Sequence, residues 1–216
     1  MRKLVSLILL VALLCGMGSA FAAVGGDAAL VFQTPVLITN AGQGPGGKMA
    51  RLLMTQTGTI ALDTDFFYKS EPGRDAATGA TIDMKTDLAS FAPNALICVI
   101  GSTDKGLGAS GISIDDEVAR LEIMIAAAKE LNIPVIGVLL EKDKRSDIAT
   151  NPNERCIDVI CKNAAWMIVV KDGNLDGRFD AIKAETGAPL TILDTSMDFT
   201  MLSKTSFVKE IAAPAA

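Results

Sequence analysis

The sequence predicts an α/β fold: a single three-layer domain built on a doubly wound, mostly parallel sheet of about five strands, Rossmann-like or flavodoxin-like. Two observations lead to this prediction. Continuous apolar runs, such as ALICVIG at 95–101 and IPVIGVLL at 133–140, are typical of strands that are covered on both faces. Segments of helical periodicity alternate with these runs, which indicates βαβ units with right-handed crossovers and helices on both faces of the sheet.

The N-terminus has the pattern of a secretory signal peptide. Arg2 and Lys3 precede an apolar run at 4–14, and AFA at 20–22 is a small-residue cleavage site. We therefore expect an exported protein, located in the periplasm or outside the cell. Two alternatives stay open: a retained anchor, and a lipoprotein built on Cys15, although the leucine before it is larger than the residue that a lipobox requires.

Residues 1–22 are thus predicted as the leader and 23–216 as a single α/β domain. The chain has a formal net charge of -5, 5% aromatic residues and no basic run, which disfavours a nucleic-acid partner. No segment after the leader is apolar for long enough to span a membrane. The sequence has no histidine, which excludes Ser-His-Asp catalysis, Cys-His catalysis and any His-ligated metal site.

Each element of the domain is predicted from its local pattern. The predicted strands are the short apolar runs at 35–39, 59–63, 95–101, 133–140, 165–170 and 189–194. The predicted helices, which show helical spacing of apolar residues, lie at 46–58, 83–91, 114–132, around 156–161, at 176–186 and at 203–211. Ser113 and Asp116 form a helix-start signal before the third of these helices.

Three cysteines follow the leader. Cys98 lies inside an apolar strand, which indicates core packing. Cys156 and Cys161 share one stripe of a helix, and their five-residue spacing does not bring the two sulfurs together. We therefore expect three free thiols, which is unusual for an exported protein.

Two segments match the dinucleotide fingerprint G-x-G-x-x-G, one at 42–47 and one at 106–111. The second match begins five residues after its strand, too late for a dinucleotide site. The first match is followed by a helix, and Asp63 could contact the ribose of a dinucleotide. The same stretch also resembles a P-loop, but Met49 stands where a P-loop needs a hydroxyl for magnesium. Export also separates the chain from cytoplasmic nucleotides. We therefore expect neither NAD nor ATP to bind.

In parallel sheets, ligands bind beyond the carboxyl ends of the strands, where the strand order reverses. Both glycine-rich segments follow strands at that edge, and backbone N–H groups at helix starts bind anions. We expect one wall of a cleft at 101–113 and the opposite wall at 40–47. The alternative is that the glycines only form turns that need positive φ. The candidate ligand-binding residues are Asn40, Gln43, Gly44, Ser102, Thr103, Asp104, Lys105, Gly106 and Gly108.

A calcium site is the one metal site that the sequence suggests. Asp172, Asn174 and Asp176 match the start of a calcium loop, but Lys183 replaces the glutamate of the twelfth position, which excludes a complete EF-hand. The favoured alternative is a strand-to-helix turn in which Asn174 caps the helix and Asp176 lies in its first turn. We therefore expect no cofactor, with weak calcium binding as the exception.

Three stretches resemble an uncharacterised family, a domain of unknown function of exported bacterial α/β proteins. They are PVLITNAGQ, KGLGASGISIDDEVAR and VKDGNLDGRF, and the resemblance covers roughly residues 34–192. It implies a compact α/β domain and supplies no substrate.

The leading hypothesis is an exported, non-catalytic α/β domain that binds a small polar or anionic molecule, or an envelope protein, at the carboxyl edge of its sheet. One alternative is an enzyme that needs no histidine and uses carboxylate, serine or lysine chemistry. A purely structural envelope protein is the other. In the enzyme alternative, the residues that could converge at one edge of the sheet are Asp104, Lys105, Asp115, Asp116 and Glu141.

Overall fold

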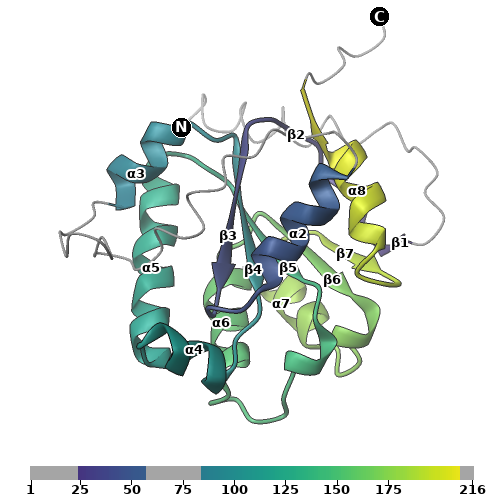
Figure 1. Ribbon diagram of the computed structural model, residues 1–216. Helices are drawn as coiled ribbons and strands as arrows, with labels where there is room; N and C mark the ends of the chain where they lie inside the picture. The colour runs from purple at the N-terminus through teal and green to yellow at the C-terminus, as the bar shows by residue number, and fades with distance from the viewer. Residues whose placement is uncertain (1–23, 57–83, 210–216) are drawn as a thin grey trace, which may run out of the picture.

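A computed structural model describes residues 24–56 and 84–209. They form an α/β fold around a six-stranded sheet of order β1-β7-β6-β5-β4-β3 (Figure 1). The predicted leader, the predicted strand at 59–63 and Asp63 lie outside the described residues.

The sheet is mixed and mostly parallel, as predicted. Strands β3 to β7 are parallel and neighbour one another in chain order, whereas β1 pairs antiparallel with β7. Among the described strands the order therefore shows no reversal, but all the parallel strands end at one edge. The strands are β1 Val24–Gly26, β3 Val36–Ala41, β4 Ala95–Ile100, β5 Val135–Leu139, β6 Trp166–Val170 and β7 Leu190–Leu193.

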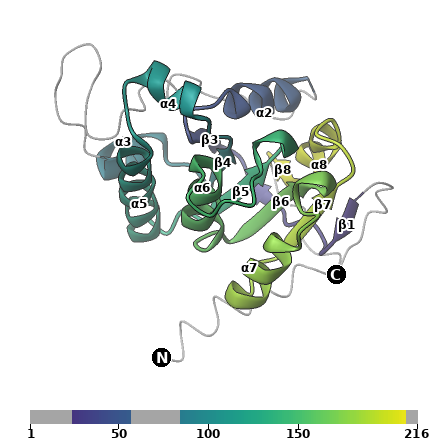
Figure 2. The same ribbon diagram turned by 90° about the horizontal axis from the view of Figure 1, so that it is seen from below.

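Helices cover both faces of the sheet (Figure 2). Helices α3, α5, α6 and α7 pack on one face through a core that includes Leu121 and Ile157, and α2 and α8 pack on the other through Leu53 and Phe199. The helices are α2 Gly46–Thr55, α3 Met84–Phe91, α4 Asp104–Ser110, α5 Ile114–Glu130, α6 Pro152–Cys161, α7 Arg178–Thr186 and α8 Asp198–Ser206, with 3-10 turns η2 Lys142–Lys144 and η3 Lys171–Gly173.

The central strands are buried along their whole length. In β4, Leu96 and Cys98 face one core, and Ile97 and Val99 face the other. Burying one such aliphatic side chain stabilises the fold by about 1.5–3 kcal/mol. Strands at this position in the sheet must therefore be apolar along their whole length. The predicted strands that lie within the described residues are confirmed, and the one at 59–63 stays a prediction.

Two predictions about helices have different outcomes. The helix-start signal is confirmed, because Ser113 and Asp116 form a capping box at the start of α5. The final helix was predicted at 203–211 but α8 ends at Ser206. Phe207 then enters β8 (Phe207–Val208), which pairs in parallel with β2 (Phe32–Gln33), because its ring is buried against Phe32 and Trp166.

Strand β1 was not predicted, because its three residues carry no apolar run. Asp27, directly after it, accepts a hydrogen bond from the backbone N–H of Leu190 at 2.8 Å and forms an ion pair with Lys183 at 2.7 Å. These contacts lower the pKa of Asp27, first through the bond from Lys183. These contacts thereby fix the start of the described residues to β7, the last strand of the six-stranded sheet in chain order.

The predicted free thiols are confirmed for the described residues. Cys98, Cys156 and Cys161 are all buried and unpaired. In the same part of the chain, no helix combines the length and the apolar character that crossing a membrane requires.

Candidate functional site

The first glycine-rich segment, which follows β3, is bound by a carboxylate from α5. The N–H of Gly42 donates to Glu117 Oε1 at 2.7 Å, and Gln43 Nε2 donates to Oε2 at 2.9 Å. Asn40 Oδ1 accepts a hydrogen bond from the N–H of Gly47 at 2.6 Å, at the start of α2. The backbone N–H groups of Gly42 and Gly47, which a phosphate would need in a dinucleotide site, therefore already donate to side chains of the protein.

Arg120 balances that carboxylate. Its Nε donates to Glu117 Oε2 at 2.9 Å and its Nη2 to Oε1 at 2.8 Å, and Nη2 also donates to the carbonyl of Asn40 at 2.6 Å. Both side chains are sealed from solvent, with 1% and 0% of their surface exposed. The pair fixes α5 to the end of β3 and to the loop after it.

The second glycine-rich segment, predicted as one wall of a cleft at 101–113, contains helix α4 from Asp104 to Ser110, which was not predicted. Thr103 caps α4, because its hydroxyl accepts a hydrogen bond from the N–H of Gly106 at 3.0 Å. The helix ends at Gly111, which adopts the left-handed conformation with φ 72°. Gly106 and Gly108 thus lie inside a helix, where their N–H groups serve the helix instead of a ligand.

The two segments touch each other directly. Gln43 and Ser102 form an isolated antiparallel bridge. A Cβ on Gly42 would lie 2.3 Å from Ser102 Cβ, and a Cβ on Gly44 would lie 2.1 Å from the carbonyl oxygen of Gly101. Glycine is therefore required here for close packing of two loops, which is a plainer role than cradling a nucleotide.

A buried polar pair lies next to this contact. The N–H of Ser102 donates to Asn153 Oδ1 at 3.0 Å, and the N–H of Asn153 donates to Asn151 Oδ1 at 2.9 Å at the start of α6. The buried polar atoms without a hydrogen-bond partner in the described residues include Ser102 Oγ and Asn153 Nδ2. Ser102 lies near the Cys156 thiol and acts to lower its pKa, against the larger effect of burial. Glu141, which follows β5, approaches the same place, since its Oε1 would lie 3.9 Å from a Cβ on Gly101.

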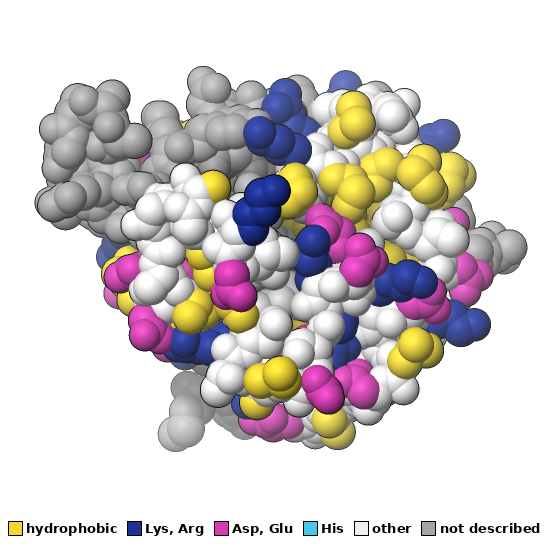
Figure 3. All heavy atoms as spheres, turned by 60° about the horizontal axis from the view of Figure 1, so that its bottom comes forward, with side chains coloured by type: hydrophobic (Ala, Val, Ile, Leu, Met, Phe, Trp, Pro, Cys, Tyr) yellow, Lys and Arg dark blue, Asp and Glu magenta, His cyan; other side chains and the backbone are white. Residues whose placement is uncertain are grey.

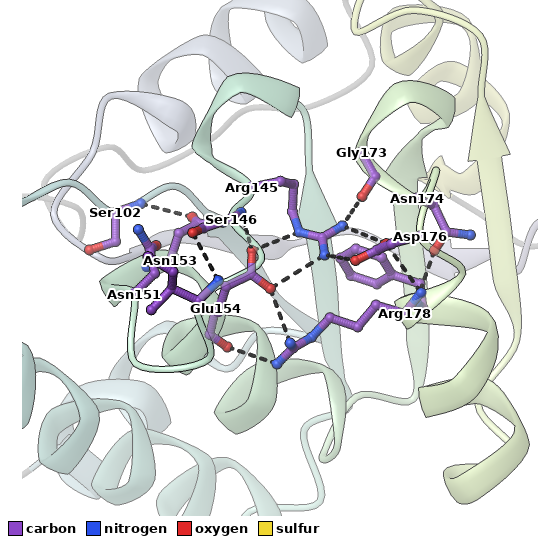
Figure 4. A network of polar contacts seen from close by, with 12 residues as sticks. Ser102, Arg145, Ser146, Asn151, Asn153, Glu154, Gly173, Asn174, Asp176 and Arg178 are labelled. Carbon is purple, nitrogen blue, oxygen red and sulfur yellow. Dashed lines mark hydrogen bonds and ion pairs between the residues drawn. The ribbon is translucent and has the colours of Figure 1, made fainter.

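A second buried glutamate, Glu154 on α6, joins three segments (Figure 4). Its Oε1 accepts from Arg145 Nε at 2.8 Å and from the N–H of Ser146 at 2.9 Å, and its Oε2 pairs with Arg178 at 3.2 Å. Arg145 also donates to the carbonyl of Gly173 and lies over the ring of Phe179. This network fixes the turns after β5 and β6 to the start of α6.

The suspected calcium residues bind other groups. Asp172 pairs with Lys142 at 2.8 Å, and Asp176 pairs with Arg145 at 2.6 Å. Asn174 Oδ1 accepts from the N–H of Phe179 at 2.9 Å, in the first turn of α7. The predicted helix start is only partly right, because Gly177 is the N-cap residue and Asp176 lies before the helix, which begins at Arg178. Within residues 24–56 and 84–209, no three His, Cys, Asp or Glu side chains are grouped so that they could hold a metal ion.

These two aspartates titrate as ion-pair partners. The bond from Lys142 lowers the pKa of Asp172, and the bond from Arg145 lowers the pKa of Asp176. Both carboxylates are therefore stabilised in their charged form by cations of the protein itself.

The residues named for a histidine-free enzyme do not share partners. Asp115 pairs with Arg155 at 2.6 Å, and Glu141 with Lys144 at 3.6 Å. Asp116 belongs to the capping box, and hydrogen bonds from Ser113 lower its pKa.

Asp104 and Lys105 are exposed on α4. Figure 3, in which the carboxyl ends of the strands come forward, shows acidic and basic side chains interspersed over this face.

Sequence reasoning missed the residues that organise this edge, chiefly Glu117, Arg120, Asn153 and Glu154. One signal was available. Glu117 and Arg120 are three residues apart and belong to the same buried side of α5 as Leu121, a position where a charged residue needs a partner.

The comparisons with known proteins concern family and fold. The profile of the family described as "Domain of unknown function (DUF6305)" matches residues 33–207. No curated protein matches the chain. Among solved structures, the chain is similar to a GDP-L-fucose synthetase from Naegleria fowleri bound to NADP, with a TM-score of 0.41 and 11% identity. The match covers 78% of this chain and 64% of that one, which is less than two thirds of the length of that protein.

Proposed function

The chain belongs to the DUF6305 family, a domain of unknown function, and we propose its function from the geometry of the site. The protein is an exported, non-catalytic α/β domain that binds a small, uncharged polar molecule at the carboxyl edge of its sheet. One observation carries the proposal. Ser102 Oγ and Asn153 Nδ2 lie at that edge, buried and without a partner in the described residues. An unsatisfied buried polar group costs about 1–3 kcal/mol, which a hydroxyl-bearing ligand would recover.

The surrounding charges favour an uncharged ligand over an anion. Glu117 already occupies the N–H of Gly42 and the side-chain amide of Gln43. Glu141 adds a carboxylate close to Gly46, at the start of α2, where the helix dipole would otherwise attract an anion. An incoming phosphate or carboxylate would therefore find these N–H groups occupied by carboxylates that Arg120 and Lys144 already balance. An envelope protein that docks at this edge is the alternative partner.

The aspartates with shifted pKa values are partners of the protein's own side chains. The pKa values of Asp27, Asp116, Asp172 and Asp176 are all lowered. In each case the first cause is a hydrogen bond from a neighbouring side chain of the protein. Such shifts are typical of ion pairs and helix caps. Export itself rests on the signal-peptide pattern of residues 1–22.

The test is a thermal-shift screen of the mature chain with neutral monosaccharides, polyols, inorganic phosphate and NAD. We expect a neutral compound to raise the melting temperature by roughly 5–10 °C at a hundredfold excess over its dissociation constant. The variant Ser102→Ala should lose that shift, while Ser110→Ala on α4, the matched control, should keep it. Stabilisation by phosphate or NAD alone, or an equal shift in Ser102→Ala, would contradict the proposal.

A further inference from the structure

The sulfur-bearing side chains of the described residues differ in exposure. The three cysteines and Met54, Met84, Met124 and Met167 are buried, and Met49 is half-buried. By contrast, 60% of Met197 and 52% of Met201 are exposed to solvent. In the described residues, all the thiols are therefore buried, whereas these two thioethers are exposed to solvent.

The buried thiols are poor targets for an oxidant. The reactive species is the thiolate, and burial raises the pKa of Cys98 and of Cys156 to about 12. Burial raises the pKa of Cys161 as well. A thioether needs no deprotonation, so its reactivity follows its exposure.

Met197 and Met201 are placed where an added oxygen can be accommodated. Met197 directly precedes α8 and Met201 lies four residues on, so both side chains project from one side of the helix. The opposite side of α8 packs into the core through Phe199 and Leu202, which are buried. A change at the two methionines therefore alters the surface and leaves the packing of α8 in place.

We propose that Met197 and Met201 form a modification site at which a hydroperoxide converts both thioethers to sulfoxides. The sulfur lone pair attacks one peroxide oxygen, an S–O bond forms and the O–O bond breaks. The proton of the attacked oxygen moves to the departing oxygen, which leaves as water when the oxidant is hydrogen peroxide. Each sulfur loses two electrons and the peroxide gains them. Two apolar side chains on the outer face of α8 become polar while the domain stays folded.

The experiment treats the folded mature chain with hydrogen peroxide and follows each methionine by peptide mass spectrometry. We expect Met197 and Met201 to gain one oxygen at least ~10-fold faster than Met124 and Met167, which serve as controls in the same chain. In urea the difference should vanish, because unfolding exposes all four. The free thiols, counted after unfolding, should remain intact.

Equal oxidation rates for exposed and buried methionines in the folded chain would overturn the proposal, as would loss of the thiols before the thioethers. The double variant Met197→Leu, Met201→Leu should keep the melting temperature of the wild type and resist the early phase of oxidation. A large loss of stability in that variant would show that the two side chains pack in the core. None of these readouts depends on ligand binding at Ser102, so each proposal can fail alone.

Discussion

The two G-x-G-x-x-G segments share their spacing and lie at the same edge of the sheet, yet they fold differently. In the first, Gly42 has a φ of 106° and its missing Cβ lets the loop pack against Ser102. In the second, Gly108 lies inside α4 with nothing within 4 Å of the place of a Cβ. The place of the helix start makes the difference. Thr103 caps α4 before the first glycine of the second segment, whereas α2 begins only after Pro45, behind Gly42 and Gly44 of the first. Glycine spacing alone therefore does not specify a loop.

The largest effect is expected where the first segment depends on a buried charge. Glu117→Gln leaves Arg120 buried with only part of its partner, and breaking such pairs costs about 3–5 kcal/mol. Urea denaturation would measure the free energy of unfolding. Glu122→Gln, an exposed position on the same helix, is the matched control and should change stability by less than about 0.5 kcal/mol. Equal effects of the two variants would show that the pair does not hold the segment.

The next effect separates packing from backbone strain. Gly42→Ala should lose about 2–4 kcal/mol, because the residue has positive φ and its Cβ would lie 2.3 Å from that of Ser102. Gly187→Ala also has positive φ, 76°, but meets nothing within 4 Å, so only the strain of about 1 kcal/mol remains. Chemical denaturation of both variants gives the difference. If Gly187→Ala costs as much, close packing is not the reason for glycine at 42.

In the second segment, replacing a glycine by alanine should raise the stability of the protein instead of lowering it. Gly108→Ala places a better helix former in the middle of α4, where there is room for its Cβ, and should stabilise the protein by about 0.5–1 kcal/mol. A rise in the urea midpoint at unchanged slope would report it. Destabilisation by this variant would indicate that the segment is not helical in solution.

The smallest effect concerns the capping box that follows the second segment. The pKa of Asp116 is lowered in the folded state, so its contribution is present above the unfolded pKa of about 4 and is lost as pH falls through the folded value. Between pH 4 and more acidic values, the stability of the wild type should decline slightly more than that of Asp116→Asn. Unfolding midpoints measured across this pH range test it, and parallel curves for the two proteins would argue against the box.

The sequence predicted the parts of the fold that depend on local pattern. ALICVIG reads as a buried strand and Ser113 with Asp116 as a helix start, because burial and capping leave their marks within a few residues. Helix α4 was missed because Gly106 and Gly108 have low helix propensity and the capping by Thr103 outweighs it.

The organisation of the candidate site was less accessible from sequence. Glu117 reaches Gly42 across 75 positions, a contact that no local pattern encodes. Ser102 was named from its place after a strand, but its partner Asn153 was not, since the two meet only once α6 has packed on the sheet. Ligand binding at these residues stays a prediction.

The contacts of Asp27 have a consequence for the order in which the chain can finish folding. A polypeptide emerges from its N-terminus, whether from a ribosome or from a translocation channel, and Asp27 emerges early. Its partners Lys183 and Leu190 emerge more than 150 positions later. Strand β1 therefore has no place to dock until nearly the entire domain is available. The first described strand is completed by one of the last, and a chain truncated before β7 would leave its own beginning unpaired.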